Sequence, residues 1–167
     1  MNMNYVPDDD ALDFIRKHEG ERLEVYADPV GLPTAGVGHL LTEDELKVFK
    51  VGDKITEEQC LKWLREDVQK AVECVNKVKA PLTKSQATAL VSLVFNIGTG
   101  AFNRSTLKKM LEQGKFTLAA AEFKRWVKAK GRTLPGLVTR RREEKELFEK
   151  GEHEEPIGGT TENRDSR

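Results

Sequence analysis

The apolar positions near the start of the chain recur with the spacing of a helix. Leu12 and Ile15 lie three residues apart, the carboxylate Glu19 follows at i+7, and an acidic run that suits a helix start precedes them. Gly20 comes next and is a typical stop signal. The spacing therefore predicts a helix that places Glu19 at the end of its apolar face.

Between Leu23 and Leu41 the helical spacing gives way to short alternations of apolar and polar residues. Turn-forming residues interrupt them: Pro29, Gly31, Gly36 and Gly38. Because turn residues between alternating runs are typical of hairpins, we expect a small antiparallel sheet with tight turns. Thr34 and the two later glycines recur at a spacing of two, which predicts one shared face with the Thr34 hydroxyl on an open surface.

The rest of the chain has mainly helical patterns. Three helix-start signals pair a threonine with a glutamate or glutamine three residues later: Thr42 with Glu45, Thr56 with Gln59, and Thr83 with Gln86. The second predicts a long amphipathic helix over about 57–79, and the third opens QATALVSLVFNIG, which is apolar nearly all round and indicates the core of a helical lobe. Shorter helices are expected over about 105–113, 117–129 and 137–150.

These elements predict an α+β chain, mainly α, with one domain over residues 1–151. A chain of 167 residues with 38% hydrophobic residues can bury one sizeable core. The expected parts are a sheet-containing lobe over about 20–56, a linking helix over about 57–79, and a helical lobe over about 81–151 that includes the N-terminal helix. Residues 152–167 are polar and interrupted by proline and glycine, so we expect a disordered tail.

The net charge is zero, but it is unevenly distributed. Residues 1–80 carry 11 basic and 17 acidic side chains, whereas residues 81–150 carry 15 basic and 6 acidic ones, a net charge of +9. The later segment is therefore a candidate surface for an anionic partner. One alternative function is accordingly a non-catalytic domain that binds a polyanion or nucleic acid, although no motif that reads bases is present.

The sequence lacks the patterns of secretion, membrane insertion and metal binding. Its start, MNMNYVPDDDALDF, has neither the basic nor the apolar region of a signal peptide, and no apolar run approaches the roughly 18 to 20 residues that span a bilayer. Cys60 and Cys74 are expected to be free thiols, because one helix would hold them about 21 Å apart. Two cysteines and three scattered histidines match no zinc spacing, so we expect no metal and no cofactor.

Glu19 and Asp28 differ in their expected surroundings, and this difference suggests acid–base chemistry. A carboxyl at the end of an apolar helix face is desolvated, so it is more easily kept protonated, as a general acid must be. Asp28 lies in a polar turn before a proline, would keep its charge, and could act as a base or electrostatic stabiliser. Glycoside hydrolysis uses such an asymmetric pair. Taken singly, a glutamate near a helix end and an aspartate before proline are more often a solvated side chain and a turn former.

The residues around this pair resemble the active-site segment of a known family. The pattern EG-RL--Y-D--G--T-G-GH-LT, which runs from Glu19 to Thr42, is similar to that of the phage-type lysozymes, the endolysins of glycoside hydrolase family 24. The likeness continues in FNIGTGAFNRSTL and AAAEFKRWVKAKGRTLPGLVTRRREEKELF, so it covers residues from about 10 to 151. Many fixed positions at fixed offsets make this a specific signal.

The resemblance implies a lysozyme-like fold and an endo-acting muramidase that binds peptidoglycan in a cleft between two lobes. Such an enzyme hydrolyses, with inversion, the β-1,4 bond between N-acetylmuramic acid and N-acetylglucosamine. The resemblance implies Glu19 as the acid, Asp28 as the second carboxylate and Thr34 as the hydroxyl that helps hold the attacking water. We also expect a monomer. Because the sequence shows no signal or membrane anchor, which some relatives have, we expect it to stay in the host cytoplasm until holin-type membrane permeabilisation opens the way to the periplasm and cell wall.

Four further residues belong to the predicted site. Leu40 and Phe95 resemble positions that line the sugar cleft, although packing in a core helix explains Phe95 equally well. His39 is expected to be a hydrogen-bonded scaffold residue. Arg140 would face Glu19 when the LF and G that follow it are aligned with the family, and the alternative is a solvated basic face.

A lytic transglycosylase on a similar scaffold is the remaining enzymatic alternative. It breaks the same bond with the sugar's own hydroxyl and can dispense with the second carboxylate. The presence of both Asp28 and Thr34 therefore argues against it. The products distinguish the two reactions, because a transglycosylase leaves an anhydro sugar and a hydrolase leaves a reducing one.

Overall fold

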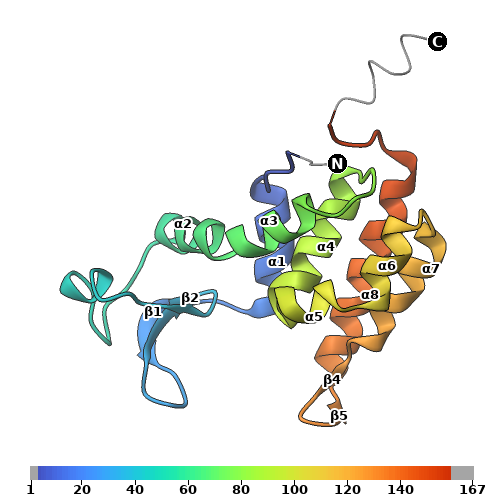
Figure 1. The fold of residues 1–167 in the computed structure, drawn as a ribbon. Coiled ribbons are helices and arrows are strands. Elements are labelled where there is room, and N and C mark those ends of the chain that lie inside the picture. Colours follow the sequence, from blue (N-terminus) through green and yellow to red (C-terminus); the bar gives the residue numbers. More distant parts are fainter. Residues whose placement is uncertain (1–3, 159–167) are drawn as a thin grey trace. The chain divides into compact units, whose positions relative to one another are not determined.

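The computed structural model describes residues 4–158, which divide into two compact units. The sheet unit, residues 7–69, contains helix α1 (Asp9–Glu19), a three-stranded sheet and helix α2 (Glu57–Asp67). The helical unit, residues 4–6 and 70–158, contains helices α3 to α8 and a short hairpin (Figure 1). The chain is mainly helical with a small antiparallel sheet, as predicted, but α1 belongs to the sheet unit rather than to the helical one.

The predicted sheet forms from strands β1 (Arg22–Ala27), β2 (Pro33–Gly36) and β3 (His39–Leu40), which pair antiparallel in that order. Tyr26 lies opposite Thr34 in the first pair, and Thr34 lies opposite Leu40 in the second. Hydrogen bonds from the backbone around Asp53 continue the pairing at the other edge of β1, where the Val25 N–H donates to the Asp53 carbonyl at 2.8 Å.

Gly36 lets β2 approach α2 closely. A Cβ atom at this position would lie 3.3 Å from Sγ of Cys60, and the backbone φ is +63°, which favours glycine. This φ also ends β2. The sequence predicted that Thr34, Gly36 and Gly38 share one face. This prediction is wrong beyond Gly36, because the strand ends there.

The helix predicted over 57–79 is two helices, α2 and α3 (Gln69–Asn76). Val68 lies between them, and its N–H still donates to the Leu64 carbonyl at 2.9 Å. Its ψ is −8°, whereas a regular helix has a ψ of about −42°, so the following peptide is tilted away from the helix axis. The prediction of one continuous helix is therefore wrong, because the helix is interrupted at Val68. Both cysteines are free, as predicted.

Helix α4 (Lys84–Ile97) forms the core of the helical unit and packs against α8 (Pro135–Lys150) (Figure 1). It begins with a full capping box between Thr83 and Gln86. Its residues from Gln86 to Val94 are all buried, as its nearly all-round apolar surface predicted. Three shorter helices follow it: α5 (Thr99–Asn103), α6 (Thr106–Glu112) and α7 (Phe116–Glu122).

A hairpin lies where the sequence predicted the end of a helix over 117–129. After α7 and a short 3₁₀ turn, strands β4 (Lys128–Ala129) and β5 (Arg132–Thr133) pair antiparallel. The two residues between them, Lys130 and Gly131, have φ values of 53° and 78°, the positive φ pair that a type I′ turn requires. Glycine in the second turn position was the sequence signal for this hairpin.

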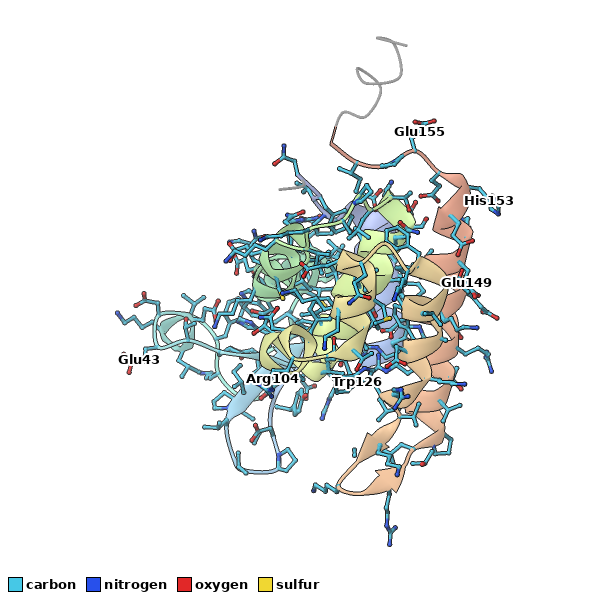
Figure 2. The ribbon with its side chains drawn as sticks, turned by 45° about the vertical axis from the view of Figure 1, so that its right-hand side comes forward. Glu43, Arg104, Trp126, Glu149, His153 and Glu155 are labelled. Atoms are coloured by element: carbon cyan, nitrogen blue, oxygen red, sulfur yellow. The ribbon has the colours of Figure 1, made fainter. Side chains whose placement is uncertain are left out.

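The prediction of a disordered tail is wrong for residues 152–158. The Glu154 carboxylate accepts hydrogen bonds from the backbone N–H and the hydroxyl of Ser85, at 3.0 and 2.5 Å. The Ile157 N–H donates to the Leu82 carbonyl at 2.8 Å. Figure 2 shows His153 and Glu155 beyond the end of α8. The first N–H groups of α4 have no partner within the helix and attract a carboxylate. The polar composition of the segment does not reveal this attraction. The rest of the expected tail, residues 159–167, lies outside the described residues.

Candidate active site

Glu19 is the last residue of α1. The Asp8 carboxylate starts this helix by accepting the Ala11 N–H at 2.9 Å, and Leu12 and Ile15 are buried along its apolar face. Glu19 itself is exposed. The burial predicted for its carboxyl is therefore not observed, because the buried face ends at Ile15, one turn earlier.

Asp28 opens the loop between β1 and β2, and its carboxylate organises that loop. Its Oδ1 accepts the N–H groups of Val30 and Leu32 at 3.0 and 2.8 Å, and its own N–H donates to the Leu32 carbonyl at 2.9 Å. Among residues 4–158, no hydrogen-bond donor reaches its Oδ2. One carboxylate oxygen is thus fixed by the backbone, and the other can accept a hydrogen bond from a further molecule.

Thr34 lies on β2 and is buried, with 3% of its surface exposed. Its hydroxyl donates to the Leu32 carbonyl at 2.9 Å. The open surface predicted for this hydroxyl is therefore wrong, because the side chain turns back toward the loop. Asp28 and Thr34 both bind the backbone of Leu32, so one short hairpin holds the two side chains.

His39 is buried between two carboxylates. Its Nδ1 lies 2.7 Å from Oδ2 of Asp67, its Nε2 lies 2.7 Å from Oε1 of Glu45, and its ring stacks on Trp63 with 4.5 Å between centroids. Burial by itself would lower the pKa of His39, but the hydrogen bonds and charges of Asp67 and Glu45 raise that pKa above its ordinary value of 6.5. These contacts support the interpretation of His39 as a scaffold residue.

The two residues predicted to line the sugar site lie in different units. Leu40 is 53% exposed on β3, directly opposite Thr34 in the sheet. Its exposed side chain next to the hairpin suits contact with a substrate. Phe95 is half-buried in α4, in the helical unit. Of the two, only Leu40 belongs to the same unit as the hairpin and lies beside it. The role of Phe95 stays a prediction.

Arg140 is buried in α8, with 3% of its surface exposed. Its Nε donates to the Glu144 carboxylate at 3.1 Å, and its Nη2 donates to the Ser92 carbonyl at 3.0 Å. The alternative of a solvated basic face is therefore wrong for this residue. Arg140 and Glu19 belong to different units, and their predicted pairing stays a prediction.

Arg140 belongs to a buried polar network that the sequence analysis missed. Glu144 is fully buried and also accepts from Nη1 of Arg141 and from the Ser92 hydroxyl, both at 2.5 Å. Arg141 further donates to the Trp126 carbonyl at 2.7 Å and to the Asn96 side chain. The run RRREE reads as a surface segment. The available signal was the spacing of Arg140, Glu144 and Phe148, which repeats every four residues on one helix face.

The described residues contain neither a metal-ligand cluster nor a membrane span. Between residues 4 and 158, no group of three histidine, cysteine, aspartate or glutamate side chains could hold a metal ion. No helix in the same range has the length and apolar character that crossing a membrane requires.

Comparisons with known proteins identify the family of this chain. The Phage lysozyme family model matches residues 16–144. An endolysin of Acyrthosiphon pisum secondary endosymbiont phage 1 is 45% identical over 144 residues, which cover 83% of this chain and 94% of the relative. A SAR-endolysin of Escherichia phage Mu is 33% identical over 124 residues, covering 74% of this chain and 69% of that protein. The crystal structure of a P22 lysozyme mutant has a TM-score of 0.77 at 34% identity and covers 87% of this chain and 99% of its own. With most of its length matched by the family model, the chain belongs to the phage lysozyme family.

Proposed function

We propose that this phage lysozyme hydrolyses the β-1,4 bond between N-acetylmuramic acid and N-acetylglucosamine, with Glu19, Asp28 and Thr34 as its catalytic residues. As a member of its family, it is a glycoside hydrolase that degrades peptidoglycan in host lysis. The observation that supports the residue assignment is the hairpin that holds Asp28 and Thr34 through Leu32. It begins three residues after Glu19, inside the range matched by the family model.

The hairpin supplies two hydrogen-bond acceptors for a water molecule. The Thr34 hydroxyl donates a hydrogen bond to the Leu32 carbonyl, so the hydroxyl oxygen can still accept one. Oδ2 of Asp28 can accept a second hydrogen bond. A water molecule that donates one proton to each oxygen keeps a lone pair for attack on the anomeric carbon. Asp28 then takes up the proton that this water loses.

Glu19 completes the reaction as the general acid. It donates its proton to the glycosidic oxygen, so that the leaving sugar departs as a neutral alcohol. Attack by water on the face opposite the leaving group inverts the anomeric configuration, and enzymes of this type hold their carboxyls roughly 6.5 to 9.5 Å apart. The expected products are an inverted reducing sugar and a free 4-hydroxyl group.

The test measures lysis of purified cell walls and analyses the products for the parent, Glu19→Gln and Asp28→Asn. Each substitution should lower the rate by about 10²- to 10⁴-fold. Asn at position 28 retains a side-chain oxygen for the N–H groups of Val30 and Leu32, so the loop should persist while the charge is lost. Glu24→Gln, which makes the same chemical change at an exposed position of β1, is the control and should remain active.

Two results would contradict the proposal. Folded Glu19→Gln that lyses walls at nearly the parent rate would remove Glu19 as the acid. Anhydro sugars in place of reducing ends would indicate the transglycosylase reaction instead.

We further propose that the enzyme acts as a monomer and reaches the wall through a separate holin-type permeabilisation of the host membrane. The 45% identical relative is named an endolysin, whereas the SAR-endolysin relative is 33% identical, which supports this route over a SAR-type one. Expression in a host should cause lysis only when a membrane pore is opened. Lysis without any pore would contradict the proposal.

A further inference from the structure

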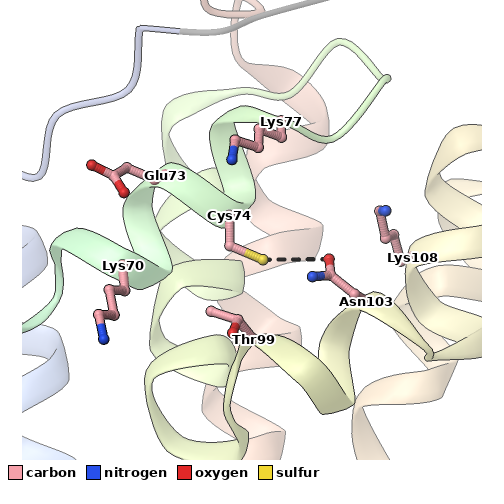
Figure 3. Close-up of a pocket in the computed structure, with 7 residues that line it drawn as sticks. All are labelled: Lys70, Glu73, Cys74, Lys77, Thr99, Asn103 and Lys108. Carbon is pink, nitrogen blue, oxygen red and sulfur yellow. Dashed lines mark hydrogen bonds between the residues drawn. The ribbon is translucent and has the colours of Figure 1, made fainter.

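A polar hollow of about 410 Å³ lies in the helical unit, between α3, α5 and α6. Figure 3 shows Lys70 and Cys74 on α3, Lys77 just beyond its end, Asn103 at the end of α5 and Lys108 on α6, with the Cys74 side chain pointing at Asn103. The residues that line the hollow thus come from three separate elements. None of them belongs to the site proposed above.

The charge of this hollow is strongly positive. Three lysines line it, and Glu73 is the single acidic residue beside them. Over residues 4–158, the structure gives no ion pair to any of these three lysines. Surface lysines elsewhere do find partners, as Lys145 does with Glu149 at 3.4 Å. Within the described chain the three ammonium groups thus outnumber the one carboxylate in the lining, and none of them is held in an ion pair.

The wall of the hollow also orients an amide donor. The Cys74 thiol donates to Oδ1 of Asn103 at 3.5 Å (Figure 3), which leaves the Asn103 NH₂ group available to donate to a ligand. Burial raises the pKa of Cys74, while the nearby charges of Lys108 and Lys77 act to lower it. The thiol therefore stays protonated and can donate its hydrogen bond. The ammonium groups of Lys77 and Lys108 lie close enough to Cys74 for their charges to influence it.

A second hollow of about 370 Å³ adjoins the first and shares Asn103 and Lys108 with it. Arg104 and Lys109 add two further cations. The acidic residue there, Glu112, already accepts the Lys79 N–H at 3.0 Å. The two hollows share part of their lining, and we refer to them together as the cationic groove, which is lined by Lys70, Lys77, Arg104, Lys108 and Lys109.

We propose that this groove binds a linear phosphodiester polymer attached to the cell wall. Several ammonium groups and one amide suit a phosphodiester, whose two charged oxygens and two ester oxygens point in tetrahedral directions toward donors on different walls, and lysine is a common phosphate ligand. Two hollows that share Lys108 suit successive phosphates of one chain. Assigning the polymer to the wall rests on the proposed function, whereas the phosphate chemistry rests on the groove alone.

The binding test uses the full chain with poly(glycerol phosphate) as the probe. The triple variant Lys70→Gln, Lys77→Gln, Lys108→Gln should bind at least tenfold more weakly, and the slope of log affinity against log salt should fall by about one per lysine removed. The control changes three other lysines of the helical unit, Lys124→Gln, Lys128→Gln and Lys130→Gln, with the same loss of charge. It should bind nearly as well as the parent.

Three binding results would overturn the proposal. Equal losses of affinity in the two triple variants would show that binding depends only on the total charge of the protein. Equally strong binding of poly-glutamate would remove the preference for phosphate. Stronger binding of single-stranded DNA that depends on the same three lysines would assign the groove to nucleic acid rather than to the wall.

A second experiment separates this proposal from the proposed function. Intact walls and walls stripped of phosphodiester polymers with hydrofluoric acid are compared as substrates. The groove variant should sediment less with intact walls but lyse stripped walls at the parent rate. Failure of the parent to lyse stripped walls would count against hydrolysis, whereas identical sedimentation of parent and groove variant with intact walls would count against the groove.

Discussion

Asp28 and Thr34 meet at the backbone of Leu32, and this shared contact determines what a substitution removes. The Leu32 carbonyl accepts both the Asp28 N–H at 2.9 Å and the Thr34 hydroxyl at 2.9 Å. A substitution of Thr34 that removes its hydroxyl leaves the carbonyl with the backbone N–H of Asp28, so the change buries no unsatisfied oxygen. Chemistry and stability can therefore be separated at this hairpin.

Thr34→Val is expected to abolish most activity while the protein stays folded. The change removes one hydrogen bond, worth about 0.5–1.5 kcal/mol of unfolding free energy, but it also removes the acceptor proposed to hold water. Thr34→Ser keeps the hydroxyl and should retain most activity. Urea unfolding and initial lysis rates measure the two effects. A valine variant that lyses walls at the parent rate would exclude Thr34 from water binding.

His39 should make stability depend on pH. A neutral imidazole has one N–H donor, so only the protonated ring can donate to both Asp67 and Glu45. Because its pKa in the folded state is raised above 6.5, its contribution is fully present below pH 6.5 and is lost as the pH rises through the folded-state pKa. The free energy difference between the parent and His39→Gln should therefore be larger at pH 6 than at pH 9.

Glu45, an acidic partner of His39, changes stability with pH in the opposite direction. Burial alone would raise the pKa of Glu45, but hydrogen bonds from the Thr42 N–H and from His39 lower it below 4.5. Its contribution is present above pH 4.5 and is lost as the pH falls. The network should thus stabilise most between about pH 4.5 and 6.5. Urea unfolding at pH values below, within and above this range checks the prediction, and an unfolding free energy difference between parent and variant that is the same in all three regions would contradict it.

At the scale of elements, the segment after α8 connects the last helix of the chain to the start of α4. Gly151 is buried at the turn, where a Cβ atom would lie 2.4 Å from Oγ1 of Thr83. Beyond it, Glu154 binds the first turn of α4 through Ser85. The order of residues 152–158 therefore depends on contacts with a helix about 70 positions earlier in the chain.

Removal of residues 152–158 should destabilise the protein. A chain that ends at Gly151 loses the two hydrogen bonds between Glu154 and Ser85, worth about 1–3 kcal/mol in unfolding free energy. A chain that ends at Gly158 keeps them and serves as the control. Chemical denaturation at neutral pH measures the difference, and equal stability of the two chains would show that the contacts contribute nothing.

The sequence predicts those features that arise from local patterns. The start of α1 at Asp8, the capping box at Thr83 and the strands from Arg22 to Leu40 all depend on neighbours within a few residues. The buried network around Glu144 could not be predicted in this way, because its partners Ser92 and Asn96 lie about 50 positions away. The exposure of Glu19 and the burial of Thr34 depend on tertiary packing in the same way.

At the scale of the whole molecule, part of the positive charge counted in the sequence is neutralised internally. Residues 81–150 have a net charge of +9, but Arg140 and Arg141 are buried and bonded to Glu144. The cations that face solvent include those of the β4–β5 hairpin and of the groove near Lys108. Attraction to an anionic wall therefore depends on exposed lysines and arginines, whose interactions salt can screen.

Lysis of whole walls should accordingly slow as salt is added, because the Debye length falls from about 10 Å at 0.1 M to about 3 Å at 1 M. Exposed charges then attract the wall over shorter distances, so fewer enzyme molecules are concentrated at its surface. Catalysis at the hairpin depends on direct contacts and should respond less. Short soluble peptidoglycan fragments, which lack attached anionic polymers, are therefore the control and should show a flatter dependence on salt. Turbidity assays on walls and reducing-end assays on fragments make the comparison. Equal salt dependence on both substrates would mean that the exposed cations do not guide the enzyme to the wall.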